Sequence, residues 1–253
     1  MRKAWIGAVI GIVAYVIFVA AQVPASWVIS RLQQQVPGLQ LMGAKGGFWS
    51  GHADQVVYNQ QQLEQVDWKL NPLTLLKGCL GYAVNGLWHG QPLSVNAGVK
   101  WNKQPCITDL QGEIDLASLL EVMQMPVEAE GVLNLDIDRL DFSTEASLPM
   151  IAGDIEWREA RVLSPMEMDL GEAHLQVSQE GEMMMGTLTS EGGNVLIDAP
   201  LEISTEGGFT LNMVIRTEGE ATEDIDATLG AFAEFHDGAY HLDYSDNIYS
   251  LMQ

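Results

Sequence analysis

The sequence predicts an all-β fold: a mostly antiparallel, twisted and curved sheet, with one N-terminal transmembrane helix and short helical insertions. Three observations in chain order support this prediction. An uncharged apolar run occupies residues 4–21, a stretch marked by Trp and Gly follows, and the long remainder alternates between apolar and polar residues. An apolar face opposite a polar face is typical of antiparallel strands.

The apolar run has nearly the ~20 residues that span a hydrocarbon core. Arg2 and Lys3 precede it, which favours a cytoplasmic N-terminus by the positive-inside rule. We therefore expect a cytoplasmic tip at 1–3, a transmembrane anchor at 4–22 and a periplasmic remainder. A cleaved signal peptide is the alternative, although the run exceeds the usual ~7–15 apolar residues of such peptides.

A helical linker is expected at residues 23–38. Trp27, Ile29 and Val36 belong to a set of apolar residues at helical spacing, and Pro37 with Gly38 ends the pattern. A single periplasmic β domain is then expected at 39–253. Its clearest alternating strands lie at 93–101, 110–116, 133–137 and 209–215, and short helices are expected at 117–125 and 222–235.

Charge is distributed unevenly. Residues 1–109 carry eight Lys/Arg and four Asp/Glu, whereas residues 110–253 carry four and 30. Phosphate groups would repel so acidic a body, which excludes nucleic acid as a partner. The acidity favours solubility, and a docking surface for a basic partner is the alternative.

Two cysteines, Cys79 and Cys106, would suit one disulfide in an oxidising compartment, although two unpaired thiols remain an alternative. Gly-rich and Trp-containing segments recur, which favours β-hairpins with Trp in the core and Gly at the bends. The expected structural core therefore contains five tryptophans: Trp49, Trp68, Trp88, Trp101 and Trp157.

No residue pattern indicates catalysis, a cofactor or a metal. Ser50 lacks the nucleophile elbow of hydrolases. His236, Asp237, His241 and Asp243 are close in sequence but fit a surface hairpin better than a metal site. We therefore expect a protein that is not an enzyme and has no catalytic, cofactor-binding or metal-binding residues.

Four motifs, in this order and spacing, resemble the protein N family of the type II secretion system. They are GGFWSGHA at 46–53, WKLNPLTLLKG at 68–78, LQGEIDL at 110–116 and GDIEWREA at 153–160. The resemblance covers essentially the whole chain.

The resemblance implies a single-pass inner-membrane subunit that faces the periplasm and takes part in the export of folded proteins by protein-protein assembly. Its implied partners are other secretion subunits, in the inner-membrane platform or the secretin. The alternative function is a periplasmic lipid-binding or lipid-bridging protein with an apolar β groove.

Overall fold

The computed structural model describes residues 37–58, 61–123, 127–142, 148–164, 166–219 and 223–247. Within these ranges no helix combines the length and apolarity needed to cross a membrane. The expected tip, the anchor at 4–22 and the helix up to Val36 lie outside the described residues, so the anchor and the linker stay predictions. The described residues form two compact units, and the boundary between them falls between Ala97 and Gly98.

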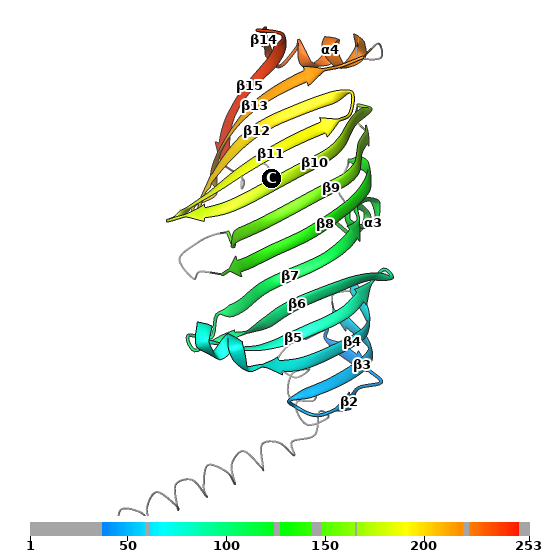
Figure 1. Cartoon of the computed structure of the whole chain (residues 1–253), viewed down its shortest axis with the longest axis vertical. Helices are drawn as coiled ribbons and strands as arrows, with labels where there is room; N and C mark the ends of the chain where they lie inside the picture. Colours follow the sequence, from blue (N-terminus) through cyan, green and yellow to red (C-terminus); the bar gives the residue numbers. More distant parts are fainter. Residues whose placement is uncertain are drawn as a thin grey trace, which may run out of the picture. The chain divides into compact units, whose positions relative to one another are not determined.

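The first unit is an antiparallel sheet built from successive hairpins (Figure 1). β1 (Gln40–Met42) and β2 (Lys45–Gly46) both pair with β3 (Ser50–Tyr58). β4 (Gln61–Asn71), the 3-10 helix η1 (Pro72–Lys77), β5 (Cys79–Trp88) and β6 (Gln91–Lys100) follow. β6 begins in this unit and ends beyond its boundary.

The first glycine-tryptophan motif forms the start of this sheet. Gly51 lies under the Trp68 ring, where an added Cβ would approach both the ring and the carbonyl oxygen of Lys45 much too closely. The Trp68 indole donates a hydrogen bond to the Gly47 carbonyl oxygen at 3.2 Å. Ala53 is completely buried. The small residues of this motif therefore make room for the ring of Trp68.

The second unit is also an antiparallel sheet in which most strands pair with their neighbours in sequence. Its strands are β7 (Pro105–Asp115), β8 (Glu128–Asp141), β9 (Met150–Ser164), β10 (Met168–Glu180), β11 (Met183–Gly192), β12 (Val195–Ser204), β13 (Gly208–Thr217), β14 (Glu234–His236) and β15 (Ala239–Asn247). β15 pairs with β13, which leaves β14 at the end of the strand order. The prediction of a mostly antiparallel all-β fold is confirmed.

Two short helices interrupt the strands. α3 (Leu116–Met123) follows β7, close to the predicted position. α4 (Glu223–Leu229) is shorter than the expected helix at 222–235. The amide of Gly230 bonds to the Asp226 carbonyl oxygen, a turn follows, and the later residues of the expected helix form β14. Gly230 and the sheet pairing of β14 explain why helical spacing misled the prediction there.

Candidate functional site

The two faces of the second unit differ sharply in chemistry. One row of directly paired residues crosses β7 to β12 as Gly112, Leu135, Ile155, Leu175, Leu188 and Ala199. The row one residue away on each strand consists of Glu113, Asn134, Glu156, His174, Thr189 and Asp198. Since successive strand residues point to opposite faces, the first row lies on an apolar face and the second on a polar face.

The helices cover only part of the apolar face. Ile225 of α4 belongs to a buried cluster with Ala173 and Val195, and Leu229 packs against that cluster. Both α3 and α4 lie at the same end of the strands (Figure 1). Farther along the strands, Leu135, Ile155 and Leu175 are only half-buried. The described residues therefore leave a partly uncovered apolar surface, which is a feature of binding sites.

The polar face is held by a network around one arginine. Arg158 Nη2 donates hydrogen bonds to Glu113 Oε1 and Asn134 Oδ1, each at 2.8 Å. Asn134 Nδ2 donates to Glu156 Oε2, also at 2.8 Å. These contacts join β7, β8 and β9 on one face. Their residues are partly exposed, so we assign them mainly a role in fixing strand register.

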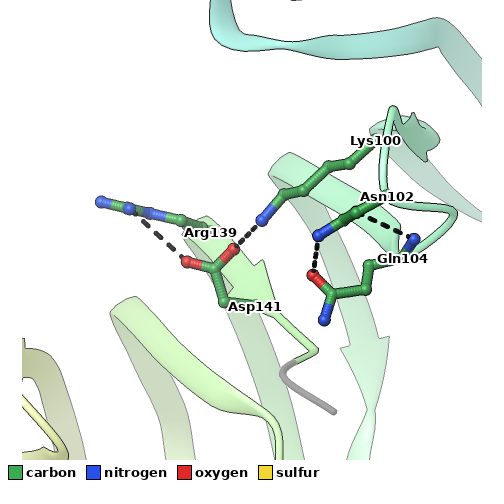
Figure 2. A network of polar contacts seen from close by, with 5 residues as sticks. All are labelled: Lys100, Asn102, Gln104, Arg139 and Asp141. Atoms are coloured by element: carbon green, nitrogen blue, oxygen red, sulfur yellow. Dashed lines mark hydrogen bonds and ion pairs between the residues drawn. The ribbon is translucent and has the colours of Figure 1, made fainter.

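A second network binds the end of β6 to β8 within the second unit (Figure 2). Lys100 Nζ lies 2.8 Å from Asp141 Oδ1, and Arg139 Nη1 lies 3.5 Å from Asp141 Oδ2. In the turn after Lys100, Asn102 and Gln104 exchange hydrogen bonds of 2.6 and 3.1 Å. The Asp141 carboxylate thus interacts with two basic side chains, in a unit that has few of them.

Three tyrosines, Tyr82, Tyr240 and Tyr244, have raised pKa values. Burial raises the pKa of Tyr82 in β5 to about 12, and its ring packs edge-on against Phe48 at 5.7 Å. The pKa of Tyr240 is raised by desolvation first, and then by the negative charge and hydrogen bond of Asp226. A tyrosine hydroxyl is protonated at neutral pH even without such a shift, so these shifts matter only at alkaline pH.

The sheet edge at β14 carries exposed aromatic side chains. All three residues of β14 are exposed. Phe235 is 64 % exposed and Phe232, just before the strand, is 76 % exposed. An edge strand offers backbone groups for pairing with another chain, and its shortness limits uncontrolled association. Sequence reasoning missed this pair because residues 222–235 were assigned to one helix.

The expected tryptophan core is only partly present. Trp68, Trp88 and Trp157 are half-buried, and Trp157 packs against the cluster beneath α4. The prediction for Trp101 is wrong: it is 80 % exposed, because it lies in the turn after β6 and escapes the strand alternation. Trp49 is also at the surface, 36 % exposed in the bend before β3.

The predicted hairpin at Asp237 and Gly238 is confirmed. Both residues have positive φ angles, of 53° and 76°, as the tight turn between β14 and β15 requires. The His236 and His241 rings stack with centroids 3.6 Å apart.

One group in the described part of the chain brings three donors within reach of a single ion. Ligand atoms of Glu156, Glu172 and His174 all lie within 4.8 Å of one another on the polar face. The sequence signal was the pair Glu172 and His174, which share a strand face. All three are at least partly exposed, and Glu156 already bonds to Asn134. The group alone does not establish a metal site.

The described residues of the second unit thus form a two-faced antiparallel sheet with a partly uncovered apolar face and an exposed edge strand. Comparison with known proteins agrees with the motifs described above. Residues 37–243 match the model of the family described as type II secretion system (T2SS), protein N. The chain belongs to this family.

A protein of Aeromonas hydrophila named type II secretion system protein N is similar to this chain. The two are 24 % identical over 212 residues, which cover 80 % of this chain and 82 % of the relative. No solved structure matches the chain. The resemblance predicted from the motifs is thereby confirmed.

Proposed function

We propose that the chain is an inner-membrane, periplasm-facing accessory subunit of the type II secretion system. It takes part in the export of folded proteins across the outer membrane by assembling with other subunits, not by catalysis. The observation that carries this proposal is the family match, which spans residues 37–243 and thus nearly all of the described chain.

The geometry of the second unit supports an assembly role. Its partly uncovered apolar face and the edge at β14 both offer area for protein contacts. Residues 98–253 carry 31 Asp/Glu and six Lys/Arg, and so acidic a unit favours a partner with a basic surface. The partners of this proposal are inner-membrane platform subunits or the secretin.

The proposed location follows from the N-terminal sequence. Residues 4–22 anchor the chain as a single transmembrane helix, with the N-terminus in the cytoplasm and the bulk in the periplasm. The charge and length of the apolar run support this topology.

The test is chemical cross-linking of the full-length protein in its native membranes, with mass spectrometry of what is captured. The proposal expects other type II secretion subunits among the cross-linked proteins. A matched sample in which the cross-linker is quenched before use controls for co-purification. Capture of no secretion subunit, from cells that express the whole system, contradicts the proposal.

A second function, lipid binding, is favoured by the row of half-buried aliphatic residues across β8, β9 and β10. Such an apolar face can bind acyl chains as readily as it binds the apolar surface of another protein. Mass spectrometry of lipid that remains bound after purification tests this function. Stoichiometric lipid in the absence of captured subunits would rank lipid binding above assembly.

A further inference from the structure

Four leucines are exposed around η1 of the first unit. Leu73 is 68 % exposed, Leu75 41 %, Leu76 86 % and Leu80 40 %. Single exposed leucines are ordinary on protein surfaces, but a group this dense in sequence forms an apolar projection. Leu73, Leu75 and Leu76 lie in the motif at 68–78, and the proposed function assigns no role to any of the four leucines.

The turn that presents these leucines is firmly built. Asn71 caps its start, and the side chain of Asn71 accepts a hydrogen bond from Leu73 N at 3.1 Å. Gly78 ends it in the left-handed conformation, with φ 75°, and bonds to the Leu75 carbonyl oxygen. Both ends of η1 therefore have hydrogen-bonded caps.

Thr74 fastens the middle of the turn to the sheet. Its hydroxyl donates to the Asn71 carbonyl oxygen at 2.7 Å and accepts from the Gly81 amide at 3.0 Å. Thr74 is only 6 % exposed, although its neighbours Leu73 and Leu75 are open to solvent. A polar residue is thus buried where an apolar one would be usual, and the leucines face outward.

We propose that η1 inserts its leucines into the periplasmic surface of the membrane that carries the chain. This inference rests on the membrane anchor of the proposed function. The occupant is the interfacial region of a phospholipid bilayer, where acyl chains begin and aliphatic side chains are shielded from water.

Charge favours the first unit as the part that meets the bilayer. Residues 37–97 hold three lysines and three acidic residues, so this segment is neutral and anionic headgroups do not repel it. Residues 98–253 are strongly acidic, with 31 Asp/Glu against six Lys/Arg. Anionic headgroups therefore repel the second unit.

The composition of the projection and its distance from the anchor favour lipid over protein. Its exposed large apolar residues are leucines, whereas protein interfaces are enriched in Tyr, Trp and Arg. About 17 residues separate the end of the predicted anchor at Gln22 from β1, and they span at most ~60 Å. A domain tethered this closely stays near the bilayer surface.

The test places a photoreactive amino acid at Leu76 of the full-length chain. A matched variant carries the same group at Leu163, an exposed leucine of the acidic second unit. Both are reconstituted in vesicles of phosphatidylethanolamine and phosphatidylglycerol and irradiated. We expect at least about fivefold more lipid adduct at position 76, since that position lies within the interfacial region.

Flotation of the vesicles tests whether the chain is attached to the membrane, independently of where η1 lies. A chain that does not float with the vesicles overturns the anchor and this inference with it. A chain that floats but gives equal lipid adducts at both positions overturns this inference alone. Adducts at position 76 with proteins instead of lipid, when irradiated in native membranes, also overturn it.

A second variant removes the neighbouring leucines without touching the probe. Leu73→Ser combined with Leu80→Ser changes two exposed side chains, so thermal unfolding should be unchanged. The lipid adduct at position 76 should fall several-fold. An undiminished adduct contradicts insertion of the leucine group.

Discussion

The Trp157 indole in β9 donates a hydrogen bond to the Glu130 carbonyl oxygen in β8 at 2.9 Å. Trp68 in the first unit bonds in the same way to the Gly47 carbonyl oxygen. Both rings occupy space left by a glycine, Gly131 in the first case and Gly51 in the second. In each unit, a glycine at one place in the sequence therefore makes room for the ring of a tryptophan at another.

Gly131→Ala should unfold the second unit more easily. The added Cβ would lie 2.5 Å from Trp157 Nε1 and from the Arg158 carbonyl oxygen, at a position whose φ is 119°. We expect a loss of roughly 2–4 kcal/mol in the free energy of unfolding, measured with urea.

Gly181→Ala is the matched control for that substitution. Gly181 also has a positive φ, of 66°, but nothing lies within 4 Å of an added Cβ. It should cost only the backbone strain of about 1 kcal/mol. Equal losses for the two variants would show that ring packing against Gly131 is unimportant.

Thr74→Val should loosen η1. The substitution keeps the shape but leaves the buried Gly81 amide without its acceptor, which costs about 1–3 kcal/mol. Thr74→Ser keeps the hydroxyl and serves as the control. Urea unfolding should rank Thr74→Ser above Thr74→Val in stability, and the reverse order would mean that the hydroxyl does not hold the turn.

Added NaCl should stabilise the protein. Residues 98–253 carry 31 acidic and six basic residues, and their mutual repulsion weakens as the screening length falls from ~30 Å at 0.01 M to ~8 Å at 0.15 M. Salt also weakens the pairs at Asp141 and Arg158, but partly exposed pairs contribute little. The melting temperature should rise with NaCl; a fall would show that these pairs outweigh the repulsion.

Because Tyr82 is partly buried, the folded protein should lose stability at alkaline pH. Its pKa is raised from 10.0 to about 12 in the folded state, so the folded chain retains a proton that the unfolded chain releases. This contribution to stability is complete below pH ~10 and is lost as the pH rises towards ~12. The Tyr82→Phe variant has no hydroxyl group at this position, so its stability does not change with pH through this residue. The difference in free energy of unfolding between the unchanged protein and Tyr82→Phe should shift in favour of the variant above pH ~10. A difference that stays constant with pH would contradict the raised pKa of Tyr82.

Cys79 and Cys106 remain predicted to form a disulfide. Both are nearly buried, with exposures of 1 % and 7 %. Peptide mapping without reductant should find them linked. For the 26 residues that separate them, replacing both with Ser should cost about 3 kcal/mol. Two free thiols in the oxidised protein would contradict the pairing.

Much of this fold was predictable because its strands alternate strictly. The strand at 209–215 shows apolar residues on every second position, and the structure places it in β13. The turn at Asp237 and Gly238 followed from residues that accept a positive φ. These signals are local, so they can be read without knowledge of distant contacts.

What depends on distant packing could not be predicted. The outward direction of the leucines in η1 follows from the contact between Thr74 and Gly81, which sequence spacing does not reveal. Trp101 fits the alternation of β6 yet lies beyond its last residue. The neighbours Glu156 and His174 come together only through the register of β9 and β10.

The most direct test of the account is site-specific photo-crosslinking in native membranes, from Phe235 at the β14 edge and Leu175 on the apolar face. Gln176, the next residue of β10 and on the polar face, is the control position. We predict covalent adducts with other type II secretion subunits at Phe235 or Leu175, and none at Gln176. Lipid adducts alone, or no adduct at either position, would contradict a role in assembly.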